Sequence, residues 1–232
     1  MTASFKKTIR QAFVDTTPVM AGYLVLGMGF GILLRTKGYG PLWAFCMSFF
    51  IYAGSMQYLT IDLLTGGASL IAAALTTLLV NARHLFYGIS MVEGYKGMGK
   101  KKPYAIFALT DETYSLVCQD NAHPDQKSFH SYAFWVSVLD QCYWVAGSMA
   151  GSLLGSVIPF DVTGIDFALT ALFVTVFIEQ WLNTKDHASA LIGVGASLIC
   201  LLLFGADSFL IPAMIAILLS LTALRAIRKE AA

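Results

Sequence analysis

The sequence predicts an all-α, polytopic membrane protein with about 6–8 transmembrane or re-entrant helices. Of its 232 residues, 57% are hydrophobic and only 12% are charged. A soluble domain carries about 25% charged residues, because charge keeps a surface hydrated. The apolar runs are also continuous over about 20 residues, whereas strands of a membrane β-barrel alternate apolar and polar residues. Helices in a bilayer therefore explain the sequence better than a soluble core or a barrel.

Eight apolar segments are candidate membrane helices, and short polar joints connect them. None of these joints is long enough for a soluble domain, so residues 1–232 are predicted to form a single integral membrane domain. The N-terminal stretch is basic but lacks a short apolar core with a cleavage site, and we expect it to be a retained cytoplasmic lead-in. The segments cover about residues 17–34, 41–64, 68–91, 104–120, 131–157, 165–182, 187–204 and 207–226.

Basic residues give the expected topology, because loops rich in Lys and Arg stay in the cytoplasm. If all eight segments crossed the bilayer, the middle basic cluster would lie on the opposite side from the first and the last. The conflict disappears if the segments at 41–64 and 165–182 are broken or re-entrant, and both termini are then cytoplasmic. The three clusters are Lys6, Lys7 and Arg10; Lys96, Lys100, Lys101 and Lys102; and Arg225, Arg228 and Lys229.

A weak internal similarity suggests two repeat halves, residues 13–91 and 131–204. Small-residue spacings recur in the first segment of each half, and Gln57 aligns with Gln180 near the end of the second. With both second segments re-entrant, the halves would have opposite orientations. Inverted repeats of this kind are common in secondary transporters.

Three polar residues interrupt the apolar stretch LLVNARHLFYG, residues 78–88. On a continuous helix Asn81 and His84 share one face, with Arg83 reaching sideways to a carboxylate of the protein or of a substrate. A charge at the centre of a membrane helix costs about 2.5–3.5 kcal/mol on insertion scales, so it usually has a partner or a watery path. The alternative is that the helix ends near Val80 and Arg83 extends to the interface.

A second polar island, LTDETY, contains Asp111 and Glu112 within the segment 104–120. A carboxylate at this depth needs a cation, and Arg83 is the arginine available in a neighbouring segment. We therefore expect Arg83 to pair with Asp111 or Glu112. Such a pair could be a static clamp between helices or could have a gating or proton-coupling role.

A third candidate region is the stretch FFIYAGSMQ, residues 49–57. Gly54 can unwind the helix, and the helix end beyond it can face a charged ligand group through its dipole. Plain helix packing through small residues is the alternative. The candidate residues here are Tyr52, Gly54, Ser55 and Gln57, with Gln180 as the counterpart in the second half, and Asp140 and Gln141 as further candidates to line a cavity.

Other chemistry is not indicated. The net charge of +1 gives no basis for nucleic-acid binding, and the four cysteines stand singly in apolar segments. No metal-ligand spacing, phosphate-binding loop or nucleophile–base motif occurs, so we expect no cofactor, no metal and no enzymatic activity.

Four motifs together resemble those of the AzlC family, the large subunits of branched-chain amino acid exporters. They are F-x-Y-A-G-S-x-Q at 50–57, L-V-N-x-R-H-x-x-Y-G at 79–88, L-T-D-E-x-Y at 109–114 and G-x-D-F-A at 164–168. The resemblance covers nearly the whole chain.

The resemblance implies a multi-pass protein of the cytoplasmic (inner) membrane that exports leucine, isoleucine and valine, and in some members methionine. It also implies a small hydrophobic AzlD-type partner and coupling to the proton motive force. The residues suit such a cargo, since Arg83 or the helix end near Gly54 could hold a carboxylate and Asp111 or Glu112 an ammonium group. The alternative is a non-transporting membrane scaffold or assembly subunit whose polar residues clamp helices together.

Overall fold

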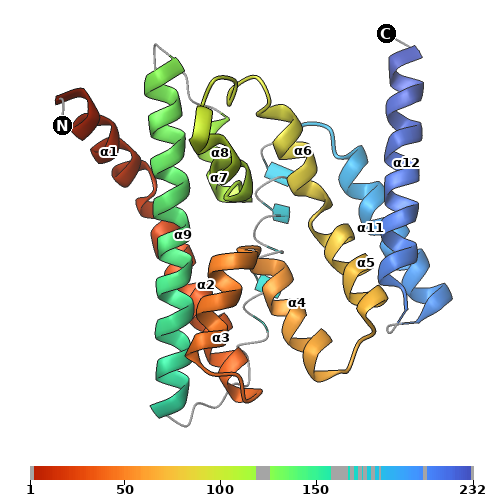
Figure 1. Ribbon diagram of the computed structural model, residues 1–232. Helices are drawn as coiled ribbons and strands as arrows, with labels where there is room; N and C mark the ends of the chain where they lie inside the picture. Colours follow the sequence, from red (N-terminus) through yellow and green to blue (C-terminus); the bar gives the residue numbers. More distant parts are fainter. Residues whose placement is uncertain are drawn as a thin grey trace. The chain divides into compact units, whose positions relative to one another are not determined.

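The computed structural model describes residues 3–118, 126–157, 167, 170–171, 174, 177–178, 181–182, 184–205 and 208–230 (Figure 1). All regular secondary structure in these residues is helical, which confirms the predicted all-α class. The chain divides into two compact units, residues 1–169 and 170–232, and each is described by itself.

The first unit contains two long helices, several short ones and two short turns of other helix types. They are α1 (Ala3–Asp15), α2 (Thr17–Thr36), α3 (Pro41–Cys46), a π-helical turn η1 (Met47–Ile51), α4 (Gly54–Thr65), α5 (Leu70–Val80), α6 (Ala82–Ser90), a 3-10 turn η2 (Gly99–Lys101), α7 (Lys102–Phe107), α8 (Asp111–Val117) and α9 (Gln126–Val157).

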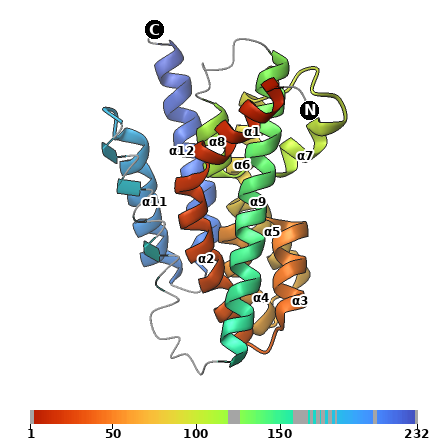
Figure 2. The same ribbon diagram turned by 90° about the vertical axis from the view of Figure 1, so that its left-hand side faces the viewer.

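Helices α2 and α9 form the axis of this unit and run in the same direction, side by side (Figures 1 and 2). Glycines let the two backbones approach. A Cβ added at Gly147 would lie 2.8 Å from the carbonyl oxygen of Leu24, and one at Gly155 would lie 3.4 Å from the Cα of Ile32. Small residues at such an interface replace side-chain packing by direct backbone contact, as in membrane helix pairs.

The predicted break within 41–64 is present. Helix α3 begins with Pro41 at its first position, where the missing N–H has no intrahelical role, and runs into η1. The chain then turns at Tyr52, whose φ of 47° and ψ of 49° are left-handed, before α4 begins at Gly54. Tyr52 rather than Gly54 supplies the unusual backbone conformation, at a typical cost of about 1–2 kcal/mol.

A second break corrects the prediction of one uninterrupted segment at 104–120. Helix α7 ends at Phe107 and α8 begins at Asp111. Thr110 has extended backbone (φ −84°, ψ 177°), and its side chain accepts a hydrogen bond from the N–H of Thr113, which is a strong helix-start signal. The two hairpins, α3–η1–α4 and α7–α8, come from opposite ends of the unit and meet near its middle (Figure 1).

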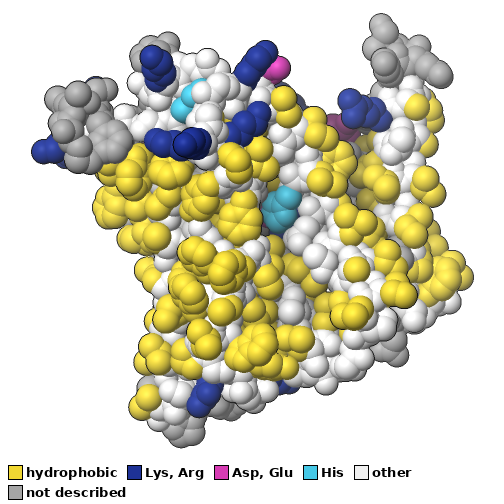
Figure 3. All heavy atoms as spheres, viewed as in Figure 1, with side chains coloured by type: hydrophobic (Ala, Val, Ile, Leu, Met, Phe, Trp, Pro, Cys, Tyr) yellow, Lys and Arg dark blue, Asp and Glu magenta, His cyan; other side chains and the backbone are white. Residues whose placement is uncertain are grey.

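Helices α5 and α6 together run the length of the unit and differ from one straight helix only at Asn81. The stretches Thr17–Thr36 and Leu70–Ser90 are both long and apolar enough to cross a bilayer. Large apolar side chains such as Leu70 and Phe86, 89% and 61% exposed, cover the outside of α5 and α6. Figure 3 shows a broad field of hydrophobic side chains, with Lys and Arg gathered mostly along its upper edge.

The start of α1 and the connection between α6 and α7 lie at the same end of this unit (Figures 1 and 2). The first two basic clusters therefore share an end, as predicted, because the hairpin at 41–65 does not cross and the chain returns through α5 and α6. The repeat halves 13–91 and 131–204 stay a prediction, because much of the second half lies outside the described residues. Helices α2 and α9, the first helix of each half, run in the same direction, so the opposite orientation expected of an inverted repeat is wrong for this pair: the hairpin α7–α8 does not cross, and α9 starts from the same end as α2.

In the second unit, α11 (Ala188–Phe204) and α12 (Leu210–Glu230) follow one another in the chain and lie side by side. Both match predicted segments. Most of the predicted segment at 165–182, including the candidate Gln180, lies outside the described residues. The break expected in that segment stays a prediction.

Candidate functional site

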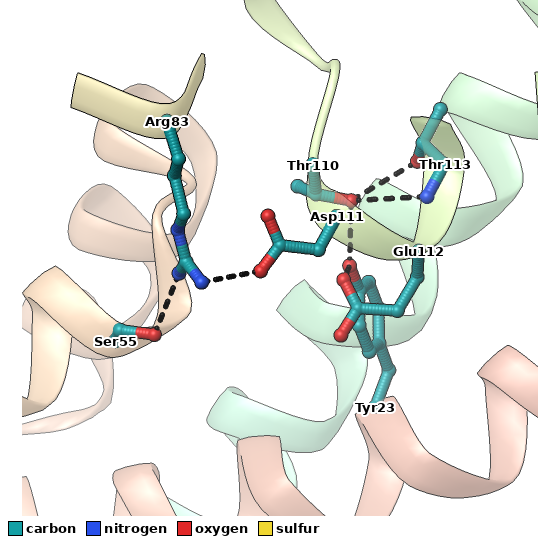
Figure 4. Close-up of polar contacts among 7 residues, drawn as sticks. All are labelled: Tyr23, Ser55, Arg83, Thr110, Asp111, Glu112 and Thr113. Atoms are coloured by element: carbon teal, nitrogen blue, oxygen red, sulfur yellow. Dashed lines mark hydrogen bonds and ion pairs between the residues drawn. The ribbon is translucent and has the colours of Figure 1, made fainter. Parts of the chain in front are cut away.

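Arg83 and Asp111 form an ion pair where the two hairpins meet (Figure 4). Nη1 of Arg83 lies 2.5 Å from Oδ2 of Asp111, and the two side chains are 32% and 30% exposed. The contact predicted between the two polar islands is therefore present. Helix α5 does end at Val80, as the alternative predicted. The guanidinium of Arg83, however, points toward the hairpins and does not extend to a membrane interface.

Ser55 ties the ion pair to the other hairpin. Nη2 of Arg83 donates a hydrogen bond of 2.9 Å to Oγ of Ser55, in the first turn of α4. No side chain caps this helix start, where Ala53 stands at the capping position. The first N–H groups of a helix have no intrahelical acceptor and carry the positive end of the helix dipole. The guanidinium and this uncapped end therefore make one electropositive region.

Several polar atoms around the ion pair are buried and have no hydrogen-bond partner. They include Nε of Arg83 and Oδ1 of Asp111, together with Oη of Tyr52 and Oδ1 of Asn81. Buried polar atoms are nearly always bonded, and exceptions concentrate at sites with a function. The unbonded nitrogen donor and the three unbonded oxygen atoms in this region can bind a ligand that carries one positive and one negative charge.

Glu112 lies beside the pair but makes a different contact. Its Oε2 accepts a hydrogen bond of 2.6 Å from the hydroxyl of Tyr23 on α2. The same Tyr23 hydroxyl is 2.7 Å from Oγ1 of Thr110. Asp111 and Glu112 thus point to different neighbours, as adjacent helical residues must. Figure 4 shows Asp111 directed at Arg83 and Glu112 directed at Tyr23.

Asp140 on α9 is a fully buried carboxylate in the same region. Its Oδ2 accepts a hydrogen bond of 2.7 Å from the hydroxyl of Thr113, while its Oδ1 has no partner. The sequence pointed to Asp140 only as a further candidate. It gave no reason to select Tyr23, Thr110 or Thr113, although Thr110 before Asp111 is a recognisable helix-start signal.

Gln57 and Gly54 lie against α9 and hold the first hairpin in place. Nε1 of Trp144 donates a hydrogen bond of 2.9 Å to Oε1 of Gln57, and Nε2 of Gln57 donates one of 3.2 Å to Ser48. A Cβ added at Gly54 would lie 3.0 Å from Cη2 of Trp144. Glycine is therefore needed at position 54 for close approach rather than for an unusual backbone conformation.

Gln141 on α9 connects both hairpins. Its Oε1 accepts a hydrogen bond of 2.7 Å from Tyr104 in α7, and its Nε2 donates one of 3.0 Å to the carbonyl oxygen of Phe49 in η1. Tyr52 at the tip of one hairpin also contacts Phe107 at the tip of the other, with ring centroids 6.3 Å apart. The polar face of α9 thus fixes the hairpins relative to each other.

The remaining candidates lie at the edge of this arrangement. Asn81 stands at the junction of α5 and α6, and the helical face that it was predicted to share with His84 stays a prediction. The ring of His84 contacts Tyr87, with centroids 6.0 Å apart. Within the part of the chain that the structure describes, no group of three or more His, Cys, Asp or Glu residues could hold a metal ion.

Comparison with known proteins supplies a further finding. Residues 18–158 match the family described as "AzlC protein". The chain is 46% identical to the "Branched-chain amino acid transport protein AzlC" of Bacillus subtilis (strain 168), over 93% of this chain and 85% of that protein. It is 40% identical to an "Uncharacterized membrane protein" of Helicobacter pylori (strain J99 / ATCC 700824), over 95% of this chain and 96% of that one.

A more distant relative is the "Inner membrane protein YgaZ" of Escherichia coli (strain K12), 26% identical over 90% of this chain and 85% of that protein. No solved structure matches the chain. Together with the apolar helices, the relatives named as membrane proteins make this chain a helical membrane protein.

Proposed function

The chain belongs to the AzlC family, and from this premise we propose that it is the large subunit of a secondary active exporter of branched-chain amino acids. The cargo is leucine, isoleucine and valine, with methionine as a further substrate. The Bacillus subtilis relative is named as a branched-chain amino acid transport protein, which supports the cargo class. The arrangement of charges at the hairpin tips supports a transport site.

One observation carries the proposal: an accessible, incompletely bonded ion pair lies where two broken helices meet. Arg83 and Asp111 are each about one-third exposed on the first unit, and each keeps one buried atom without a partner. Broken helices at membrane depth are tolerated only where protein or a water-filled cavity surrounds them, and transporters use them to bind substrates. A purely structural clamp would bond these atoms fully.

A zwitterionic amino acid fits these groups. Its carboxylate binds the guanidinium of Arg83 and the uncapped N-terminal end of α4. Its ammonium group binds Asp111 or Glu112. The branched tail contacts the aromatic side chains at the tips, Tyr52 and Phe107. When the substrate binds, Arg83 exchanges part of its bond with Asp111 for a bond with the substrate carboxylate. Substrate binding therefore changes the contact between the two hairpins.

The orientation follows from the basic residues. The clusters at Lys6 to Arg10 and at Lys96 to Lys102 share one end of the first unit, and basic loops stay in the cytoplasm. That end of the first unit faces the cytoplasm in our proposal, both chain termini are cytoplasmic, and the membrane is the inner membrane. Export is driven by protons entering the cell. Two further carboxylates supply groups that could carry a proton: Glu112, next to Asp111, and Asp140, which is bonded to Thr113.

A small hydrophobic AzlD-type subunit completes the transporter. The support for this partner is the family alone. The large apolar side chains exposed on α5 and α6 form a surface that can contact either lipid or a partner helix.

The test is amino acid release from loaded cells. A strain without the chain and the small partner gene is fed leucine-, isoleucine- or valine-containing dipeptides, and intracellular amino acids are measured over time. We expect accumulation in this strain and rapid release when both genes are restored. The variant Arg83→Ala, which is expected to reach the membrane, serves as the control. Equal intracellular levels in all strains would refute the proposal.

A further inference from the structure

A continuous chain of hydrogen bonds joins Glu112 to Asp140 through three hydroxyl groups. The oxygen–oxygen distances along it are 2.6 Å from Glu112 to Tyr23, 2.7 Å from Tyr23 to Thr110, 3.1 Å from Thr110 to Thr113 and 2.7 Å from Thr113 to Asp140. All four distances fall within the range of hydrogen bonds between oxygens or close to it. Three helices, α2, α8 and α9, contribute to the chain.

The number of protons in this hydrogen-bonded chain determines the total charge of its two carboxyl and three hydroxyl groups. Each of the four oxygen–oxygen contacts needs one proton between its two atoms, and each hydroxyl has only one proton to donate. The three hydroxyls therefore fill three contacts. If both carboxylates were ionised, one contact would have two oxygen lone pairs facing each other in a buried site. One additional proton, on Glu112 or on Asp140, fills the chain completely.

The proton has two equivalent arrangements. When Asp140 holds it, each group donates toward Glu112, in the order Asp140, Thr113, Thr110, Tyr23. When Glu112 holds it, every hydrogen bond reverses. Passage from one arrangement to the other breaks one O–H bond at the first carboxyl group and forms one at the second, with each hydroxyl accepting one proton and releasing its own. No electrons are transferred and no co-reactant is needed.

We propose that Glu112 and Asp140 share a single proton along this chain, and that binding of the substrate ammonium group at Glu112 moves the proton to Asp140. This inference rests on the proposed transport function and assigns its coupling residues. Glu112 is half-buried beside the Arg83–Asp111 pair, whereas Asp140 is fully buried. Glu112 is thus the accessible end, where a proton and an ammonium group exclude each other, and Asp140 is the internal store.

Other charged and titratable groups surround the two ends of the chain. Arg83 and Asp111 flank Glu112, and their opposite charges partly cancel there. Further groups are His84 and Tyr87 on α6, which both face Arg83 and Asp111. Tyr52 at the tip of the first hairpin faces Glu112 and Asp140, and Tyr104 on α7 faces Asp140 and Cys142 of α9. None of these groups replaces Tyr23, whose hydroxyl donates the hydrogen bond to Glu112.

The first experiment compares two transport modes in proteoliposomes that contain the full chain and its small partner. Leucine movement driven by a pH gradient needs net proton transfer, whereas exchange of labelled for unlabelled leucine does not. We test Thr113→Val and Tyr23→Phe, which remove one hydroxyl each. Positioned proton transfer contributes on the order of 10²–10⁴-fold, so gradient-driven movement should fall on the order of 100-fold and exchange far less.

Matched controls remove hydroxyls outside the chain. Thr60→Val removes a hydroxyl that bonds only the carbonyl oxygen of Met56, and Tyr58→Phe removes one that bonds the carbonyl oxygen of Leu26. Both controls should keep both modes. Thr113→Ser restores the hydroxyl and should restore gradient-driven movement. Equal retention of both modes in the test variants overturns the inference, and so does equal loss of both, which would mean a structural role.

A second measurement, infrared spectroscopy of the purified full chain, does not depend on transport. At neutral pH the wild type should show the C=O band of one protonated carboxylic acid. This band should be absent in the double variant Glu112→Gln, Asp140→Asn. It should be unchanged in Asp15→Asn, because the carboxylate of Asp15 accepts a hydrogen bond from Tyr132 and is not part of the hydrogen-bonded chain. Leucine should shift the band in the wild type but not in Asp140→Asn.

The two measurements separate the two proposals. Absence of leucine exchange in the wild type refutes the transport function, even if the carboxylic acid band is present. Absence of the band refutes the shared proton, even if leucine exchange is rapid.

Discussion

Trp144 of α9 and Gln57 of α4 are joined by a hydrogen bond of 2.9 Å between the indole Nε1 and the amide Oε1, and both side chains are buried. Gly54 allows this contact, because any side chain there would meet the indole ring. The first hairpin is therefore positioned by α9, a helix that begins more than sixty residues later in the chain.

Replacement of Gln57 by Leu should destabilise the protein. The change leaves the indole N–H of Trp144 buried without an acceptor, which typically costs about 1–3 kcal/mol. Adding Trp144→Phe removes the donor as well, so the double variant should lose less than the sum of the two single changes. Thermal unfolding midpoints in detergent measure this. The exposed Gln126→Leu is the control, and strict additivity would contradict the expected coupling.

Close contact of α2 and α9 predicts a strong effect at Gly151. A Cβ there would lie 2.6 Å from the Cα of Met28, a backbone atom that cannot rotate away. Gly151→Ala should force the helices apart and lower stability by about 1–3 kcal/mol, the usual scale for overpacking. Gly193→Ala, whose new methyl group meets nothing within 4 Å, should be neutral or stabilising. An unchanged unfolding midpoint for Gly151→Ala would show that the helices do not touch there.

Arg83 distinguishes a transport site from a scaffold. A hydrogen bond to a charged group typically contributes about 1.5–3 kcal/mol, so Arg83→Ala should reduce leucine export roughly 10- to 100-fold. Arg83→Lys keeps the charge but loses the planar fork that also reaches Ser55, and should be intermediate.

The double variant Arg83→Met, Asp111→Leu removes both charges while it keeps the approximate volume. Replacing both partners of an ion pair by apolar residues often leaves stability unchanged. We expect normal membrane insertion and no export. Normal export by this variant would favour the scaffold alternative.

Cysteine labelling tests the arrangement of the hairpins. In a background without Cys46, Cys118, Cys142 and Cys200, single cysteines are placed at Lys7, Ala68 and Lys100. A membrane-impermeant maleimide should label positions 7 and 100 from the cytoplasmic side and position 68 from the other. Position 68 follows α4 at the end opposite the basic clusters. Labelling of positions 7 and 100 from opposite sides would mean that the α3–η1–α4 hairpin crosses the membrane.

Local sequence patterns were sufficient for the helical segments and for the existence of the polar islands. Seven of the eight predicted segments contain described helices at matching positions, because long apolar runs specify membrane helices without reference to neighbours. The break near Gly54 was predictable from its small residues. The break at Ala108–Thr110 was missed, although Thr110 carries a helix-start signal, since average hydropathy conceals a short interruption.

An ion pair of Arg83 with Asp111 or Glu112 could be predicted by elimination, because a carboxylate at membrane depth needs a cation and few were available; the structure selects Asp111. The hydrogen-bonded chain from Glu112 to Asp140 could not. Thr and Tyr hydroxyls are common in helices and usually bond the backbone of their own turn, as Thr60 does. Their joining into one chain depends on how α2, α8 and α9 pack.

The amino-acid order alone determined that this protein is helical, that it belongs in a bilayer, and that a few ionisable groups must find partners inside it. Hydrophobicity and the cost of an unpaired charge act on each segment separately, so their effects can be inferred from the sequence of that segment alone. Which hydroxyl touches which carboxylate, and which glycine lets two backbones meet, was decided only by the packed structure. Such contacts join residues about 30 to 120 positions apart, and their geometry depends on every helix between them.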